Sequence, residues 1–143
     1  MPLLSVRNLS VKLGNGNPVD GVSFDIAPGE TFALLGESGC GKSMTALALM
    51  GLLPDVAAIE RGGIEFEGRE ISRLGTGERR KLRGGAMGMI FQEPATSLNP
   101  VFTIGYQIGE SLAVHRGLSG AAARKRAIEL LDAVGIPDAA RRH

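Results

Sequence analysis

An eight-residue stretch, Gly36 to Ser43, constrains the fold of this chain more than any other feature. Its sequence, GESGCGKS, fits the pattern of a glycine, four residues and Gly-Lys-Ser or Gly-Lys-Thr that defines a phosphate-binding loop. The apolar run 31–35 before it has the length of a buried strand, and residues 44–50 after it are good helix formers. A strand, a glycine-rich turn and a helix start together predict an α/β fold around this loop.

The residue types of the loop suit phosphate chemistry. Glycines let the backbone take positive φ and approach a ligand without Cβ clashes. A helix N-terminus offers unpaired N–H groups and about half a positive charge. Lys42 is expected to reach the β- and γ-phosphates, and the Ser43 hydroxyl to bind Mg²⁺. A glycine-rich turn that merely precedes a lysine is the alternative, which the flanking pattern disfavours. The expected nucleotide-binding residues are Gly36, Ser38, Gly39, Cys40, Gly41, Lys42, Ser43 and Met44.

Composition narrows the functional classes further. The 143 residues suffice for one domain with a core, and a net charge of +1 gives no electrostatic reason to expect a nucleic acid partner. Cys40 is the only cysteine, so an internal disulfide is impossible and a reducing cytosol fits. No apolar run reaches the ~18 residues of a membrane helix, and residues 1–7 lack the plan of a secretory signal. We therefore expect a protein that is cytoplasmic or peripheral to a membrane.

The front of the chain predicts a small β-layer. Residues 3–13 alternate imperfectly between apolar and polar, 14–18 form a dense turn signal, and 19–26 alternate again, which indicates a hairpin. Residues 62–68 predict a further strand of this layer. An apolar strand is also expected over 87–91, directly before Gln92.

The rest of the chain predicts helices. Thr76 is expected to open a short helix whose basic run forms a solvated face. Thr103 is expected to cap a helix with apolar positions 104, 108 and 112 that ends at Gly117. Ser119 is expected to cap a last helix before Gly135. The residues expected on the apolar stripe of that helix are Ala123, Ala127, Leu130, Leu131 and Val134.

Taken together, these stretches resemble the ATP-binding subunit of ABC transporters along the whole chain. The sequence VDGVSF at 19–24, before PGE at 28–30, is similar to that family's approach to its phosphate-binding loop. The sequence MIFQEP at 89–94 resembles its Q-loop. More narrowly, GKSMTALA at 41–48 and QEPATSLNP at 92–100 are similar to the branch that imports dipeptides, oligopeptides and nickel.

The resemblance implies an α/β P-loop NTPase core with an antiparallel β-subdomain over residues 1–92, and an incomplete helical subdomain over 93–143. It implies ATP and Mg²⁺ as cofactors, with Lys42 and Gln92 in catalytic roles and Ser43 and Gln92 at the metal. The family stacks adenine on an aromatic side chain, where this chain has Leu13. Val19 is expected to share that apolar contact.

The resemblance also implies partners: a second ATP-binding subunit, transmembrane permease subunits and, indirectly, a substrate-binding protein. The location would be the inner face of the cell membrane, with peptides as the leading cargo and nickel second. Residues 95–115 would face a permease, with Leu98, Val101 and Phe102 as candidate contacts, although core packing explains each of them equally well.

Several of the family's motifs are not identifiable in this sequence: the signature, the Walker B aspartate, the catalytic glutamate and the switch histidine. Leu118-Ser119-Gly120 is similar to the start of the signature, but Ala121 follows, so we interpret it as a turn and helix cap. We therefore expect ATP binding without useful turnover, from either a fragment or a truncated product. Two alternatives stay open: a non-catalytic regulatory module docking on transporter subunits, and, less favoured, a P-loop kinase or GTPase.

Overall fold

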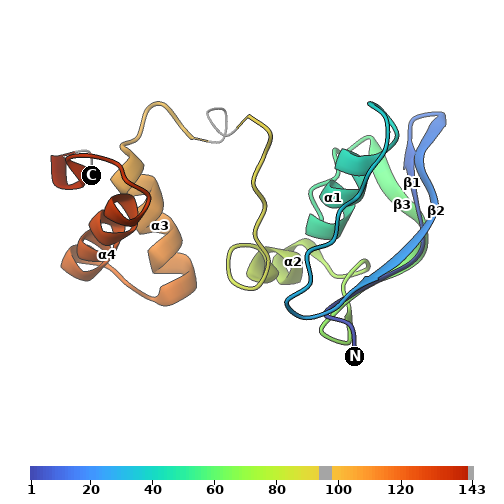
Figure 1. Cartoon of the computed structure of the whole chain (residues 1–143), viewed down its shortest axis with the longest axis horizontal. Helices are drawn as coiled ribbons and strands as arrows, with labels where there is room; N and C mark the ends of the chain where they lie inside the picture. The colour runs from blue at the N-terminus through green and yellow to red at the C-terminus, as the bar shows by residue number, and fades with distance from the viewer. Residues whose placement is uncertain (94–97, 142–143) are drawn as a thin grey trace. The chain divides into compact units, whose positions relative to one another are not determined.

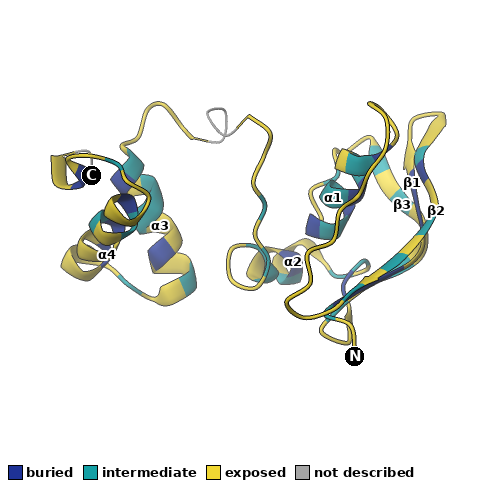
Figure 2. Ribbon diagram, in the orientation of Figure 1, coloured by how far each residue is buried: buried dark blue, intermediate teal, exposed yellow. Residues whose placement is uncertain are grey.

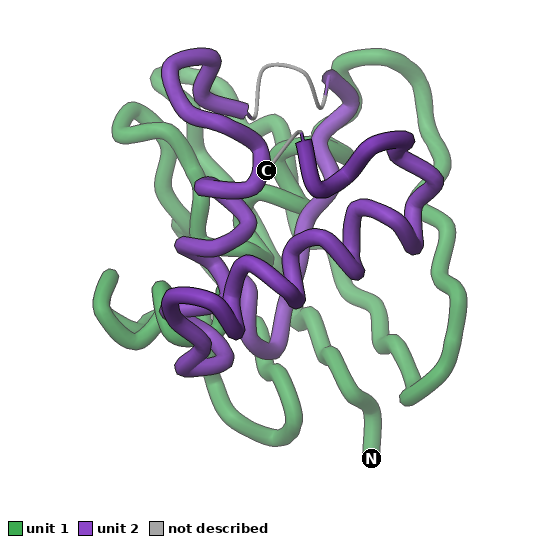
Figure 3. Tube along the Cα trace, turned by 90° about the vertical axis from the view of Figure 1, so that its left-hand side faces the viewer, with its two compact units in different colours: residues 1–83 green, residues 84–143 purple. Residues whose placement is uncertain are grey.

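The computed structural model describes residues 1–93 and 98–141 and divides into two compact units, residues 1–83 and 84–143 (Figure 3). The division falls after Arg83, a few residues before the boundary expected after Gln92. The first unit holds a sheet with helices α1 and α2, and the second holds helices α3 and α4 (Figure 1).

The sheet of the first unit is antiparallel, with strand order β2-β1-β3-β4. Its strands are β1 (Leu4–Leu13), β2 (Gly16–Ile26), β3 (Ala57–Phe66) and β4 (Arg69–Glu70). In the centre of the sheet Val6 lies opposite Phe24 on β2 and Ile64 on β3. The predicted hairpin and β-layer are confirmed, although β3 begins before the predicted residue 62.

One face of the sheet carries the core of the first unit. Helix α1 (Lys42–Met50) contacts β1 and β2, and the buried residues gather between the helix and the strands (Figure 2). The side chains with relative exposure of 2% or less include Val6, Leu9, Val11, Val19, Ala48, Ile64 and Ile71. The loop that begins α1 is thus attached to a packed layer, which fixes where its backbone lies.

The two apolar runs predicted as central strands do not form strands. Residues 31–35 are extended but have no strand partner within the described residues, and Leu35 is 89% exposed. In residues 87–91 Met87 accepts a hydrogen bond from the amide of Gly84, whereas Ile90 is 93% exposed. A strand exists only through hydrogen bonds to a neighbouring strand, so apolar composition alone could not produce one here.

The second unit is a pair of packed helices, α3 (Ile104–Arg116) and α4 (Gly120–Ala133), followed by a 3-10 turn, η2 (Ala139–Arg141). The amide of Tyr106 donates to Thr103 Oγ1 at 3.2 Å, which confirms the predicted cap, and Gly117 ends α3 in a left-handed conformation. Leu112, Ala127 and Leu131 are buried in this unit. The expectation for Val134 was wrong: it follows the last turn of α4 and is 73% exposed.

Helix α2 (Thr76–Leu82) begins at Thr76 as predicted, with Gly75 at the capping position. The basic run was expected to form a solvated face, but Arg79 is only 6% exposed. Its neighbours Arg80 and Lys81 are exposed as expected. Within residues 1–93 and 98–141, no helix has the length and apolar character needed to cross a bilayer.

Candidate nucleotide-binding site

The loop before α1 presents its backbone in the form that anions favour. Gly39 and Gly41 have φ of 81° and 90°, so left-handed residues alternate with Cys40 and turn successive amides toward one side. The ladder of α1 begins with the amide of Thr45, which donates to Gly41 O at 2.8 Å. The amides of Lys42, Ser43 and Met44 precede that ladder, receive no side-chain cap and lie at the positive end of the helix dipole.

Gly41 is required for packing as well as for its backbone angle. A Cβ at this position would lie 2.0 Å from Pro18 O and 3.3 Å from Val19 Cγ2. Strand β2 therefore presses directly against the loop, and only a glycine fits between them. Thr45 of α1 also holds the backbone at Gly41, because its buried hydroxyl donates to Gly41 O at 3.0 Å. From the sequence, Pro18 was placed in a turn signal and Thr45 in the stretch after the loop, but neither of them was assigned a part in the site.

Lys42 lies across the loop. Its ammonium donates to Gly36 O at 2.7 Å and to Glu37 O at 2.6 Å, and it lies 3.4 Å from Cys40 Sγ. These acceptors are uncharged, and no ion pair of Lys42 occurs among the described residues. Phosphate oxygens are stronger acceptors for an ammonium than carbonyls are, so a phosphate could displace them.

A cavity of about 290 Å³ opens beside Lys42 between β2, the extended run and α1. Its lining residues are Pro18, Val19, Asp20, Val22, Leu34, Leu35, Cys40, Lys42 and Thr45. The volume approaches the lower end of small-molecule sites, about 300 Å³. The cavity places Lys42 and Cys40 together with Val19, which is 2% exposed. Leu13 lies instead at the end of β1, opposite Gly16 and Ala57, and is 38% exposed.

The other expected site residues differ in what surrounds them. Gly36, Ser38 and Ser43 are exposed, and Met44 is half-buried in the first turn of α1. Gln92 belongs to the second unit, so its expected part at the metal rests on the resemblance alone. Residues 94–97 of the stretch 92–100 lie outside the described residues.

The donors available for Mg²⁺ are few. Among the described residues no three His, Cys, Asp or Glu side chains gather into a metal-binding group. A magnesium ion would therefore depend on the Ser43 hydroxyl and on phosphate oxygens. Mg²⁺ accepts this, since it keeps several waters and commonly binds through substrate phosphates.

Comparison with known families gives this loop its context. The sequence model of the ABC transporter family matches residues 19–143, which is most of the chain. The chain belongs to the ABC transporter family. The match includes the loop, α1, Gln92 and both helices of the second unit.

Individual relatives agree with the family match. The chain is 49% identical over 141 residues to the dipeptide transport ATP-binding protein DppD of Bacillus subtilis (strain 168), covering 95% of this chain and 42% of that protein. It is 44% identical over 146 residues to DppD of Escherichia coli (strain K12), covering 99% of this chain and 45% of that protein. The chain thus spans less than half the length of these relatives.

Solved structures confirm the predicted fold class. A dimeric ATP-binding cassette in a post-hydrolysis state, bound to ADP and Pi, matches with a TM-score of 0.81 and 25% identity. The match covers 98% of this chain and 60% of that one. The chain is therefore an α/β P-loop NTPase core with an antiparallel β-subdomain and part of a helical subdomain.

Proposed function

We propose that this chain binds Mg-ATP through residues 36–44 and forms the N-terminal part of the ATP-binding subunit of a peptide importer. The observation that carries the proposal is the form of the glycine-rich loop at the start of α1. Helix-start amides without a side-chain cap, two left-handed glycines and an ammonium held only by uncharged acceptors occur together there. The names of the DppD relatives support peptides as the cargo of the whole subunit.

Each group of loop residues is proposed to bind a different part of Mg-ATP. The amides from Gly39 to Met44 would bind phosphate oxygens at the helix end. Lys42 would exchange Gly36 O and Glu37 O for the β- and γ-phosphates. Ser43 would hold Mg²⁺, which neutralises charge between the phosphates. Val19 and Leu13 are proposed as apolar neighbours of the base, and Gln92 as the residue that helps hold the metal and the attacking water.

Hydrolysis is proposed for the intact subunit rather than for this chain by itself. No carboxylate of this sequence can be assigned to polarise the attacking water, apart from Glu93 beside Gln92. We expect purified chain to bind ATP with negligible turnover. Steady ATPase activity that disappears in Glu93→Gln would contradict this expectation.

The proposed partners are a second ATP-binding subunit and transmembrane permease subunits on the inner face of the membrane. Exposed apolar residues precede and open α3: Val101 is 82% exposed, and the rings of Phe102 and Tyr106 stack with centroids 4.9 Å apart. Leu98 is 47% exposed. Such side chains suit a protein partner better than solvent, which supports 98–106 as a permease contact.

Isothermal titration calorimetry with Mg-ATP tests the binding proposal directly. Lys42→Ala removes the point charge at the phosphates and is expected to weaken binding by about tenfold or more. Lys125→Ala, an exposed lysine of α4 in the second unit, serves as the matched control and should bind like wild type. Equal affinity of wild type and Lys42→Ala would contradict the proposed site. A strong preference for GTP in competition would instead favour the GTPase alternative.

A further inference from the structure

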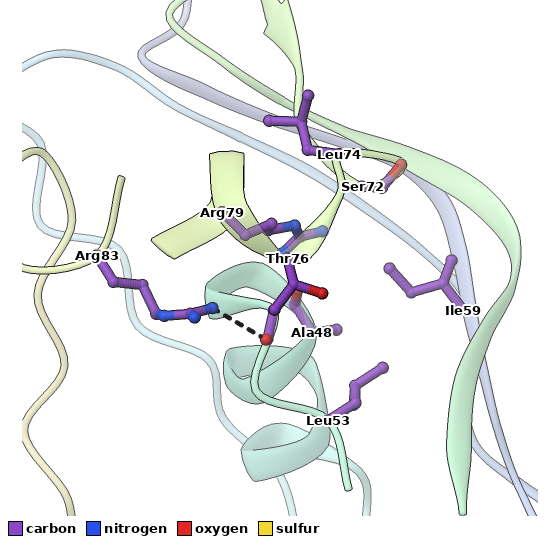
Figure 4. A pocket seen from close by; sticks show the side chains of 9 residues that line it. Ala48, Leu53, Ile59, Ser72, Leu74, Thr76, Arg79 and Arg83 are labelled. Carbon is purple, nitrogen blue, oxygen red and sulfur yellow. Dashed lines mark hydrogen bonds between the residues drawn. The ribbon is translucent and has the colours of Figure 1, made fainter. Parts of the chain in front are cut away.

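Two arginines close the C-terminal end of α1. Arg79 Nη1 donates to Ala48 O at 3.1 Å and to Leu49 O at 3.2 Å. Arg83 Nη1 donates to Met50 O at 3.2 Å and to Gly51 O at 3.1 Å. Figure 4 shows both side chains reaching over the end of the helix. Four consecutive carbonyls, of the kind that a helix end leaves unpaired, thus receive donors from α2 and its following residue. We call Arg79, Arg83 and these carbonyls the arginine clamp.

The clamp is electrostatically costly. Arg79 is 6% exposed, and neither arginine forms an ion pair with a carboxylate within residues 1–93 and 98–141. Burial lowers the pKa of Arg79, and the nearby charge of Arg83 lowers it further. The charge of Glu70 opposes this lowering. The carbonyls and the negative end of the helix dipole also stabilise cations at this position. Two buried or half-buried like charges at one helix end are more than a simple cap needs.

The end of α1 is also shaped to admit Arg79. Gly51 takes the left-handed conformation, with φ of 62°, and its amide donates to Ala48 O. A Cβ on Gly51 would lie 2.5 Å from Arg79 Nη1 and 2.7 Å from its Cδ. Beside the two arginines lies a cavity of about 300 Å³, with Leu53, Ile59 and Leu74 among its lining residues. The guanidinium groups are thus held by backbone geometry as well as by charge.

We propose that Arg79 and Arg83 are positioning residues for the nucleotide site at the opposite end of α1. The helix has nine residues, so its ends lie about 13 Å apart. A helix this short moves as a rigid body, so a shift of its C-terminal end also displaces the amides of Lys42, Ser43 and Met44. The clamp fixes the C-terminal end, and the contact of Gly41 with Pro18 fixes the other. Together they set where a phosphate meets the loop. This inference rests on the proposed function of the loop.

Four variants of the 143-residue chain test the clamp. Arg79→Met and Arg83→Met remove the donors, and Arg79→Lys keeps the charge but replaces the rigid planar guanidinium with a smaller ammonium on a flexible stem. Arg80→Met, an exposed neighbour on α2, is the matched control. Affinity for Mg-ATP should fall about fivefold to tenfold in each methionine variant, be partly restored in Arg79→Lys, and stay unchanged in Arg80→Met. Urea unfolding of every variant establishes that the comparison is made on folded protein. Arg83 is less buried than Arg79, so Arg83→Met keeps the test open if Arg79→Met does not fold.

A second measurement does not depend on ATP binding. Amide hydrogen exchange in the methionine variants should quicken at residues 45–47, whose amides begin the hydrogen-bond ladder of α1, as well as at 48–52, because the whole helix loses its orientation. Faster exchange confined to 48–52, with unchanged ATP affinity, would show a merely structural cap and overturn the inference. If wild type and Lys42→Ala both fail to bind ATP, the proposed function is wrong. The exchange at residues 45–47 then still decides whether the clamp positions the loop.

Discussion

The two ends of α1 differ in how their backbone groups are satisfied. At the C-terminal end, carbonyls 48–51 receive donors from Arg79 and Arg83, and the amide of Leu52 returns to Leu47 O at 2.8 Å. At the N-terminal end, the amides of 42–44 face a loop whose capping residue, Gly41, has no side chain to accept them. Amides at a helix start that have no protein partner are left to water or to a ligand. The contrast therefore separates a structural end from a ligand-binding end of one helix.

Gly41→Ala should break the ligand-binding end most severely. The new Cβ would meet Pro18 O at 2.0 Å in a left-handed conformation, so either β2 or the loop must move. We expect a loss of about 3 kcal/mol in the free energy of unfolding and no measurable Mg-ATP binding. Urea unfolding and calorimetry check the two effects.

Gly39→Ala is the matched control for the stability measurement. Gly39 has a similar φ of 81°, but no atom lies within 4 Å of its added Cβ among the described residues. The Gly39→Ala variant should lose only about 1 kcal/mol in the free energy of unfolding, which is the cost of placing an alanine in the left-handed conformation. Equal losses of stability in the two variants would mean that contact with Pro18 does not hold the loop.

Gly51→Ala tests the structural end in the same way. The added Cβ would displace Arg79 and strain the left-handed C-cap, with an expected loss of about 2 kcal/mol in the free energy of unfolding. Gly117→Ala, at the left-handed end of α3, has no atom within 4 Å in the described structure and should lose only about 1 kcal/mol. A difference between the two variants in urea unfolding measures how tightly Arg79 is held, and no difference would argue against the clamp.

The ligand-binding end could be predicted from the sequence, and the structural end could not. A phosphate-binding loop needs fixed residue types at fixed spacing, so the loop from Gly36 to Ser43 could be recognised from the sequence alone. The clamp depends on contacts between residues about thirty positions apart in the sequence. In addition, the sequence pattern of a basic run is the same whether its side chains are solvated or buried. Arg79 was accordingly assigned to a solvated face. Its partners are backbone carbonyls, which no side-chain pattern reveals.

The same limit explains the two apolar runs. Residues 31–35 and 87–91 have the composition of strands, but pairing is a property of two segments, and the described residues provide no strand beside either run. The hairpin of β1 and β2 was predicted correctly because its partners adjoin in sequence and a glycine-rich turn joins them. Likewise, the cap at Thr103 is a contact over three residues. In these elements, contacts between residues close in sequence were predicted correctly. Strand pairing that requires segments far apart in sequence was not.

Glu70 offers the smallest and most selective test of the region behind α1. Burial alone would raise the pKa of its carboxyl, but hydrogen bonds from the Ser72 hydroxyl and amide and from the Ile64 amide outweigh burial and lower the pKa. A group whose pKa is lower in the folded state stabilises the protein above its unfolded pKa, near 4.5. This contribution is lost as the pH falls through the lower folded value.

In Glu70→Gln the free energy of unfolding should therefore depend less steeply on pH between pH 5 and the lower folded pKa. At pH 7 the variant should lose about 1 kcal/mol or less in the free energy of unfolding. The carboxylate also favours the charged form of Arg79, so its removal should loosen the clamp slightly. Glu67→Gln, a nearby surface change in the turn between β3 and β4, should alter neither quantity. If Glu70→Gln weakened Mg-ATP binding as strongly as Arg79→Met, the clamp would have to be redefined to include this carboxylate. A change of stability without a change of affinity would confine the positioning role to the two arginines.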